Sequence, residues 1–301
     1  RSTPLYSSAA SDVYKRQALE ELQKRRKNDE YLTPTDLLRI TAELGAEATN
    51  TDFDTATFSP QTQSADDWLA KLIEGLPDDD LTEENESQRF NGALRPYQRR
   101  ALSWLQFLGR LGLGGCLADD MGLGKTPTAL AHIQSRHSDK PTLVICPLSV
   151  VHNWEQEVSQ FTPDLEVLIL HGAKRPTGDE LLERATSVNI VISTYGTATR
   201  DIENLSKIHW DLVICDEAQF IKNHQTNAAI AIRELTADQK IALTGTPVEN
   251  ILSELWSILD AINPGMLGGI SWFKEKIATP IEQKKDQKAL IGMRKLTDPY
   301  I

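Results

Sequence analysis

Six short apolar runs separated by amphipathic stretches are the feature that most constrains the fold of this chain. Between the runs, residues 98–109, 126–136, 153–161 and 225–235 show helical periodicity. Strands that are apolar throughout and alternate with helices are typical of a parallel sheet that is covered on both faces. We therefore predict an α/β fold whose functional loops follow the carboxyl ends of the strands. The apolar runs are GGCLA (114–118), TLVIC (142–146), EVLIL (166–170), NIVIS (189–193), DLVIC (211–215) and KIALT (240–244).

The part of the chain before Gly92 has a different composition. Residues 1–17 show no periodicity and look like a translated sequencing adaptor, so we expect a non-native leader. Residues 18–90 combine short helical patterns with an acidic linker and carry 7 Lys and Arg against 18 Asp and Glu. The formal net charge of the chain is −11, yet residues 91–301 contribute only −2 to it. We predict a small helical accessory segment followed by one α/β lobe, in which any contact with a polyanion depends on locally placed donors.

Cysteine usage and hydropathy exclude several classes of protein. Cys116, Cys146 and Cys215 each lie in an apolar run without CxxC spacing, so we predict reduced core residues and neither a disulfide framework nor a zinc site. The six histidines show no repeated spacing, and we predict surface or capping roles for them. No stretch approaches the roughly 20 apolar residues of a membrane span, and no secretory pattern opens the chain. We expect a cytoplasmic, nucleoid-associated location and no membrane partner.

The sequence DDMGLGKT directly follows the first apolar run and begins a helix. Gly122 and Gly124 allow backbone N–H groups to turn toward phosphate oxygens, Lys125 can reach the β and γ phosphates, and Thr126 offers a hydroxyl to magnesium. Asp119 stands where the phosphate-loop pattern has its first glycine, and the alternative is a tight glycine turn with a surface lysine. The pattern predicts an ATP and Mg²⁺ site. Its predicted residues are Asp120, Met121, Gly122, Leu123, Gly124, Lys125 and Thr126.

Asp216 and Glu217 directly follow the apolar run DLVIC. Two adjacent carboxylates at the end of a buried strand repel each other unless a cation or a proton transfer uses them. We predict that Asp216 holds Mg²⁺ through water, and that Glu217 orients and deprotonates an attacking water molecule. Taken alone, such a pair would be a solvated turn; together with a phosphate loop it predicts a hydrolytic site.

The last apolar run ends in Thr244 and continues to Gly245, Thr246 and Pro247. Short hydroxyl side chains at a strand end can connect the γ-phosphate region to groups across the cleft, so we predict Thr244 and Thr246 as coupling residues. The alternative is an ordinary strand-to-helix turn, in which Thr246 caps a helix that starts near Pro247.

Taken in order, these three elements resemble the superfamily 2 helicases, and specifically the bacterial Swi/Snf-type DNA-dependent ATPases. LRPYQ resembles the adenine-reading Q motif, and LVICPLSVVHNW, ISTYGT, DEAQFIKN and LTGTPVEN resemble motifs Ia, Ib, II and III. The resemblance covers residues 91–301 and implies a RecA-like ATP-binding lobe of the P-loop NTPase class. It further implies that residues 18–90 belong to a helicase-associated segment and that a second RecA-like lobe supplies arginine fingers. Because the chain stops at DPYI, we expect a fragment with weak ATP hydrolase activity.

The same resemblance implies roles for further residues. Gln98 would pair with adenine. Gln219 would couple the ATP site to the DNA site; many relatives have a histidine at this position, and glutamine cannot titrate as histidine does. The implied partner is duplex DNA bound without sequence reading, with RNA polymerase or another DNA-bound protein as a further partner. The alternatives are a nucleotide-gated binding module and a strand-separating superfamily 2 helicase. The implied DNA-contacting residues are Pro147, Ser149, Asn153, Thr194 and Tyr195, with Trp154, Lys222 and Asn223 as further candidates and a core role as the alternative for Trp154 and Tyr195.

Overall fold

All six apolar runs form strands. The computed structural model describes residues 85–120, 122–245 and 251–301 of the 301-residue chain. The largest difference from the predicted boundaries is in the last strand, which begins at Thr236 because this residue already pairs with His209 of the neighbouring strand. The strands are β1 (Gly115–Leu117), β2 (Thr142–Cys146), β3 (Val167–Leu170), β4 (Ile190–Thr194), β5 (His209–Asp216) and β6 (Thr236–Leu243).

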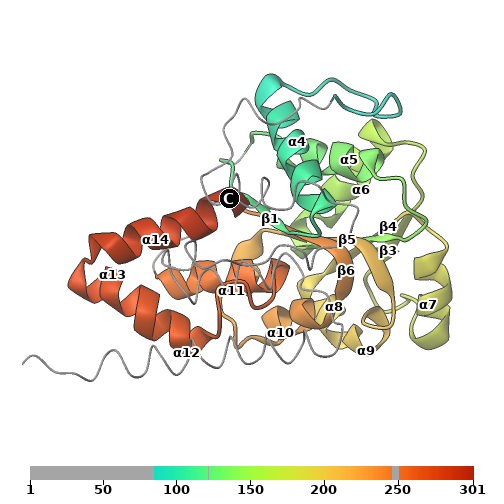
Figure 1. Cartoon of the computed structure of the whole chain (residues 1–301). Helices are drawn as coiled ribbons and strands as arrows, with labels where there is room; N and C mark the ends of the chain where they lie inside the picture. The colour runs from blue at the N-terminus through green and yellow to red at the C-terminus, as the bar shows by residue number, and fades with distance from the viewer. Residues whose placement is uncertain (1–84, 121, 246–250) are drawn as a thin grey trace, which may run out of the picture.

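The strands form one parallel sheet in the order β1-β6-β5-β2-β4-β3 (Figure 1). Leu117 of β1 and Asp216 of β5 both pair with Leu243 of β6, and Cys146 of β2 pairs with Thr194 of β4. The carboxyl ends of these strands therefore meet at one edge of the sheet. The strand order divides that edge into two neighbouring groups, β1-β6-β5 and β2-β4, with β5 at the boundary between them.

Helices cover both faces of the sheet, as predicted (Figure 1). Leu102, Leu130 and Val158 belong to the core between the sheet and three helices on one face. Leu181 and Ile232 belong to the core on the opposite face. The helices of the first face are α4 (Pro96–Arg110), α5 (Lys125–Ser135) and α6 (Val151–Phe161), and those of the second are α7 (Gly178–Thr186), α8 (Tyr195–Arg200), α9 (Ile202–Leu205), α10 (Asn227–Glu234) and α11 (Leu252–Ile262).

Three further helices follow α11 and extend away from the sheet (Figure 1). The indole N–H of Trp104 donates a hydrogen bond to the main-chain oxygen of Pro299 at 2.9 Å, and Tyr300 is buried. These contacts fix the end of the C-terminal segment against α4. The helices are α12 (Ile270–Phe273), α13 (Thr279–Lys284) and α14 (Gln287–Thr297).

The core confirms one prediction from the sequence and corrects another. The three cysteines are buried and free, as predicted. His132, for which a surface or capping role was predicted, is only 1% exposed, and its Nε2 lies 2.8 Å from Oε1 of Gln239. Burial lowers the pKa of His132 to about 4, so the imidazole is neutral. The partner residue lies 107 positions further along the chain, so local periodicity could not reveal this pair.

Some sequence predictions fall on residues that the structure does not describe. These are the leader, the accessory segment up to residue 84, Met121, and the segment 246–250 with its predicted helix start. At the beginning of the described part, Phe90 stacks on Phe161 with 5.5 Å between ring centroids, and Glu86 forms an ion pair with Arg99. None of the helices in the described ranges is long and apolar enough to cross a membrane.

Candidate functional site

The phosphate loop leaves the sheet after β1 and ends at the first residue of α5. Gly122 and Gly124 have φ angles of 84° and 77°, which side chains with a Cβ rarely adopt. Gly124 is the N-cap of α5, and a Cβ at this position would lie 2.5 Å from Nε2 of Gln98. The first N–H groups of a helix have no partner within that helix. The loop therefore presents backbone donors and the positive end of the helix dipole to any group at this edge.

Lys125 and Thr126 lie in the first turn of α5, where both are half-buried. The ammonium of Lys125 donates hydrogen bonds to the main-chain oxygens of Asp119, at 2.7 Å, and Asp120, at 3.1 Å. The lysine side chain therefore curls back over its own loop. A positive charge, a hydroxyl and free backbone N–H groups form a donor set that fits the phosphates of a nucleotide and its magnesium ion.

Gln98 lies in the first turn of α4, directly against this loop. Its Oε1 accepts a hydrogen bond from the N–H of Arg95 at 2.9 Å, and its Nε2 donates to the main-chain oxygen of Gly124 at 3.1 Å. Tyr97, which was not singled out from the sequence, donates its hydroxyl to the main-chain oxygen of Leu123 at 3.0 Å. The Q-motif helix and the phosphate loop are thus joined by side chains, and the reading of adenine by Gln98 stays a prediction.

Asp216 ends β5, and Glu217 follows it in an unusual backbone conformation. Glu217 has a φ of 50°, and positive φ in a residue other than glycine is costly and concentrates at functional sites. Its N–H donates to Oδ1 of Asp216 at 2.9 Å. Burial raises the pKa of Asp216, while the indole N–H of Trp154, the N–H of Glu217 and the charge of Lys125 act to lower it.

One acidic residue near this pair was not identified from the sequence. Glu157 on α6 is half-buried, and its Oε2 has no hydrogen-bond partner among the described residues. Burial, followed by the charge of Asp216, raises the pKa of Glu157. The described residues contain no group of three or more His, Cys, Asp or Glu that could hold a metal ion on its own.

Two of the three predicted coupling residues, Gln219 and Thr244, are among the described residues. Gln219 is half-buried in the short 3₁₀ helix η4 (Ala218–Ile221) that follows Glu217. Thr244 is fully buried, and its N–H donates to the main-chain oxygen of Leu117 at 3.1 Å. This bond connects the end of β6 to the end of β1 directly before the phosphate loop. Thr246 lies outside the described residues, so its coupling role stays a prediction.

The residues assigned to DNA contact follow β2 and β4. Ser149 and Asn153 are exposed and Pro147 is half-buried, so these three lie at or near the surface. Thr194 is 8% exposed, and its hydroxyl caps α8 by accepting a hydrogen bond from the N–H of Thr197. Tyr195 is 6% exposed and directs its hydroxyl toward Asp216. The segment after β2 is thus accessible, whereas the side chains of Thr194 and Tyr195, at the end of β4, are turned inward.

The further candidates are also placed by the structure. Trp154 is 1% exposed, which decides in favour of its core alternative. Lys222 forms an ion pair with Glu254 at 3.4 Å, and Oδ1 of Asn223 accepts a hydrogen bond from the N–H of Gln225. These two side chains therefore stabilise the segment after Asp216 within the lobe itself.

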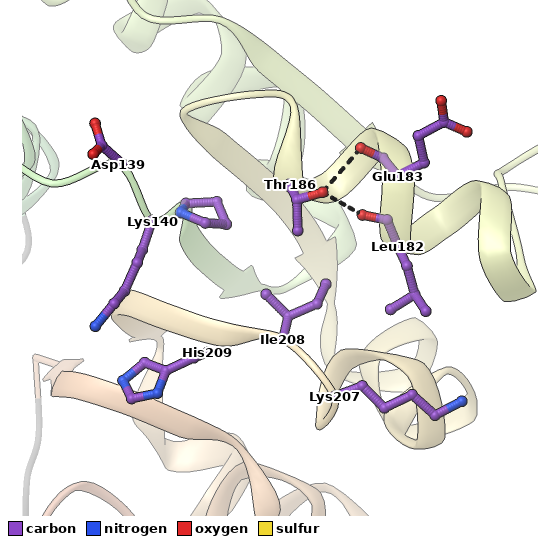
Figure 2. A pocket seen from close by; sticks show the side chains of 9 residues that line it. Asp139, Lys140, Leu182, Glu183, Thr186, Lys207, Ile208 and His209 are labelled. Carbon is purple, nitrogen blue, oxygen red and sulfur yellow. Dashed lines mark hydrogen bonds between the residues drawn. The ribbon is translucent and has the colours of Figure 1, made fainter.

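A cavity of about 480 Å³ lies away from this edge, and Figure 2 shows the residues that line it. Pro141 precedes β2 and His209 begins β5, so the cavity is at the amino ends of the strands. Lys140 and His209 both bind the carboxylate of Asp238 at the rim. The hydroxyl of Thr186 bonds to carbonyls of its own helix (Figure 2). Lys140, His209 and Thr186 thus have partners within the chain, and the residues predicted to act on a nucleotide lie at the other ends of the strands.

Comparisons with known proteins agree with this geometry. The SNF2-related domain matches residues 97–301. YwqA of Bacillus subtilis, named as an ATP-dependent helicase/translocase, is 40% identical over 253 residues, which cover 82% of this chain and 27% of YwqA. The TATA-binding protein-associated factor MOT1 of Saccharomyces cerevisiae is 37% identical over 65% of this chain and 11% of its own length.

The solved structures include a relative with the same fold. The SWI2/SNF2 ATPase core of Sulfolobus solfataricus, determined in complex with double-stranded DNA, superimposes with a TM-score of 0.65 at 41% identity. The match covers 73% of this chain and 46% of that chain. This chain therefore spans about a quarter of YwqA and less than half of the archaeal core. The sheet, the phosphate loop and these matches together show that the chain has the RecA-like fold of the SWI2/SNF2 ATPase core and belongs to the SNF2-related family.

Proposed function

We propose that this chain is the ATP-binding lobe of a DNA-stimulated translocase that hydrolyses ATP with Mg²⁺. The observation that carries the proposal is the convergence of three loops at the carboxyl ends of β1, β6 and β5. Lys125 begins the helix that follows the loop after β1, Asp216 ends β5, and Glu217 lies directly beside Asp216. A cation, a metal-binding carboxylate and a second carboxylate are the groups that phosphoryl transfer to water requires.

Each residue has a distinct role in this proposal. Lys125 and the N–H groups of the phosphate loop bind the β and γ phosphates, and Gln98 contacts the adenine. Thr126 and Asp216 hold Mg²⁺, which when bound neutralises charge on the phosphates. Glu217 orients the attacking water and accepts its proton. The exposed residues after β2 contact the DNA backbone, and Gln219, Thr244 and Thr246 connect the two functions.

Duplex DNA is the proposed partner, since the archaeal relative was solved with double-stranded DNA. Contacts to phosphate and sugar from small polar side chains fix a protein on DNA without reading its sequence. The name of MOT1 associates that relative with the TATA-binding protein, and a DNA-bound protein such as RNA polymerase is a further proposed partner here. Because the relatives are longer than this chain, the motor activity is proposed for the full-length protein, together with a second RecA-like lobe.

Steady-state ATP hydrolysis by the full-length protein, with and without duplex DNA and Mg²⁺, tests the proposal. We expect Glu217→Gln to lower turnover by at least about 100-fold, which is the range for loss of a general base. ATP binding should change less than about threefold, because Glu217 acts on the water. Glu234→Gln, which alters an exposed glutamate at the end of α10, is the matched control.

The alternatives predict other results in the same experiment. A nucleotide-gated binding module would keep its function in the Glu217→Gln protein, since it needs ATP binding and no turnover. A strand-separating helicase would release a labelled strand from a duplex at the rate of ATP use. Turnover that is unchanged by Glu217→Gln, or by the addition of DNA, would contradict the proposal.

A further inference from the structure

Two buried aromatic residues from different helices both donate hydrogen bonds to Asp216. The indole N–H of Trp154, on α6, donates to Oδ2 of the carboxylate at 2.8 Å. The hydroxyl of Tyr195, the first residue of α8, donates to the main-chain oxygen at 2.8 Å. Trp154 and Tyr195 are 1% and 6% exposed, so neither side chain can reorient without moving its helix. Each of these rings thus directs its only polar atom to the same residue.

The carboxylate of Asp216 is therefore held at both oxygens. Oδ1 accepts from the N–H of Glu217 at 2.9 Å, and Oδ2 accepts from Trp154. A carboxylate oxygen has two lone pairs, so each oxygen keeps capacity for a further contact. The donors on Trp154 and Glu217 consequently fix the plane of the carboxylate without using up its ability to hold a cation through water.

Both aromatic residues continue directly from the segments assigned to DNA. Trp154 follows the exposed Asn153, and Tyr195 follows Thr194, the residue that caps α8. The strand order puts β2 beside β5 and β4 beside β2, so both segments lie on the same side of the strand that carries Asp216 (Figure 1). Displacement of either segment by a bound ligand would move a hydrogen-bond donor of Asp216.

Tyr195 also contacts the segment that follows Asp216. Its ring stacks on Phe220 with 5.2 Å between centroids and an interplanar angle of 9°. Phe220 is 51% exposed and lies in η4 next to Gln219. Tyr195 therefore supports both sides of the acidic pair, through its hydroxyl on one side and through its ring on the other.

We propose that Trp154 and Tyr195 are positioning residues, which couple the segments after β2 and β4 to the orientation of the Asp216 carboxylate. This inference rests on the proposed function, in which Asp216 holds Mg²⁺ and DNA stimulates turnover. It assigns to Tyr195 an inward role in place of the direct DNA contact that the sequence suggested. The contact with DNA belongs to the exposed neighbours Ser149 and Asn153, and the two aromatic residues transmit it.

The test uses Tyr195→Phe and Trp154→Phe in the full-length protein. Tyr195→Phe removes one oxygen and keeps the stacked ring, so it is the cleaner variant. We expect the ratio of DNA-stimulated to basal ATP hydrolysis to fall about tenfold in each variant. The Mg²⁺ concentration that gives half-maximal hydrolysis should rise severalfold, because Asp216 is less well oriented. Affinity for duplex DNA without nucleotide should stay within about twofold of wild type, and a merely structural role would not produce this split.

Two matched variants control for the loss of a buried polar group. Trp210→Phe removes an indole N–H that donates to the main-chain oxygen of Leu205 at 3.0 Å, in a residue that is fully buried. Tyr300→Phe removes a buried hydroxyl that has no hydrogen-bond partner among the described residues. Both control variants should keep the wild-type stimulation ratio and Mg²⁺ dependence. Thermal unfolding of all four variants identifies any that fail to fold.

The outcomes separate this inference from the proposed function. A folded Tyr195→Phe protein with wild-type stimulation and wild-type Mg²⁺ dependence would overturn the inference, even if Trp154→Phe were unfolded. Equal losses in the Trp210→Phe and Tyr300→Phe controls would overturn it as well. A wild-type protein whose ATP hydrolysis ignores DNA would instead refute the proposed function, and the coupling inference would fall with it.

Discussion

The two halves of the functional edge are built differently, although one sheet carries both. The half on β1, β6 and β5 places the charged side chains of Lys125, Asp216 and Glu217 in half-buried positions with tight hydrogen bonds. The half on β2 and β4 exposes the uncharged side chains of Ser149 and Asn153 and turns its aromatic residues inward. Charged groups that take part in catalysis need a fixed geometry. Contact with the DNA backbone, which is the same for every sequence, needs only accessible polar groups.

The halves also differ in what supports them below the edge. Under β1, β6 and β5, Gln239 joins β6 to α4 and α5 through a buried polar network with His132 and Arg136. Under β2 and β4, apolar residues such as Val144 and Ile192 form the core, and the buried Ser193 donates its hydroxyl to the main-chain oxygen of Leu170 on the neighbouring strand. A polar network fixes one arrangement at the risk of a large loss when one member is removed. We call the half on β1, β6 and β5 the nucleotide half. We infer that its geometry is the more precisely fixed of the two, and that it is the more sensitive to substitution.

The largest expected effect comes from Gln239→Leu. Gln239 is 2% exposed, its Nε2 donates to the main-chain oxygens of Leu105 and Leu113, and its Oε1 accepts from Arg136 and pairs with His132. Replacement leaves several buried polar groups unpaired, so we expect a loss of about 4 kcal/mol in the free energy of unfolding. Chemical denaturation measures it, with hydrogen exchange in α4 and α5 as a local readout.

The matched control for this prediction is Gln283→Leu, in an exposed position of α13. It should change stability by no more than about 0.5 kcal/mol. A loss below about 1 kcal/mol for Gln239→Leu would mean that the polar network does not anchor the nucleotide half, and the contrast between the two halves would fail.

Lys125→Ala should act on the nucleotide half alone. Loss of a charged hydrogen-bond donor costs about 3 kcal/mol, so affinity for Mg-ATP should fall about 100-fold. Affinity for duplex DNA without nucleotide should stay within about twofold. Equilibrium binding with a fluorescent ATP analogue and a labelled duplex measures both, and Lys288→Ala, on an exposed position of α14, is the control. An equal loss of DNA affinity would show that the two halves are not separate.

The sequence predicted the elements that depend on local pattern. Residues 143–146 of β2 and 212–215 of β5 are apolar and buried, and the glycines of the phosphate loop have the positive φ angles that the pattern requires. The helices α7 to α9 and the C-terminal helices α12 to α14 were not predicted. Helices of four to six residues, such as α8, α9, α12 and α13, carry too few turns to show a clear periodicity.

The sequence named candidate residues for the site, but it could not predict the contacts between them. Trp154 lies 62 positions before Asp216, and nothing in the local sequence indicates that its indole bonds to that carboxylate. The same holds for Tyr195, whose hydroxyl meets a residue 21 positions away. An aromatic residue that follows a strand has the same sequence pattern whether it is exposed or buried. Only the packing of the folded chain shows that Trp154 and Tyr195 contact Asp216 and do not face the solvent.

Acidification should weaken the nucleotide half through His132. Burial lowers the pKa of this histidine to about 4 from an ordinary value of 6.5. Between these two pH values the unfolded chain therefore binds a proton that the native state does not bind. Stability from this group is complete above pH 6.5 and is lost as pH falls toward 4. Its contribution at pH 5 should be about 2 kcal/mol smaller than at pH 7.

Denaturant unfolding between pH 7 and pH 5 tests this expectation. His132→Leu should remove that part of the pH dependence, while His137→Asn, in an exposed position next to α5, should leave it unchanged. The buried Nδ1 of His132 has no partner among the described residues that could accept an added proton. A pH dependence that persists fully in His132→Leu would place the acid-sensitive group elsewhere and remove one difference between the halves.

The smallest expected effect is in the other half. Asn153→Ala removes one exposed side chain next to the buried Trp154, and one neutral hydrogen bond contributes about 1 kcal/mol, so duplex affinity should fall about fivefold. Gln160→Ala, exposed near the far end of the same helix, is the control, and both are measured at one fixed salt concentration because binding to phosphates depends on salt. Affinity for Mg-ATP should be unchanged in both proteins. If Asn153→Ala weakened ATP binding as much as DNA binding, the helix that carries Trp154 would belong to the nucleotide half, and the boundary at β5 would have to move.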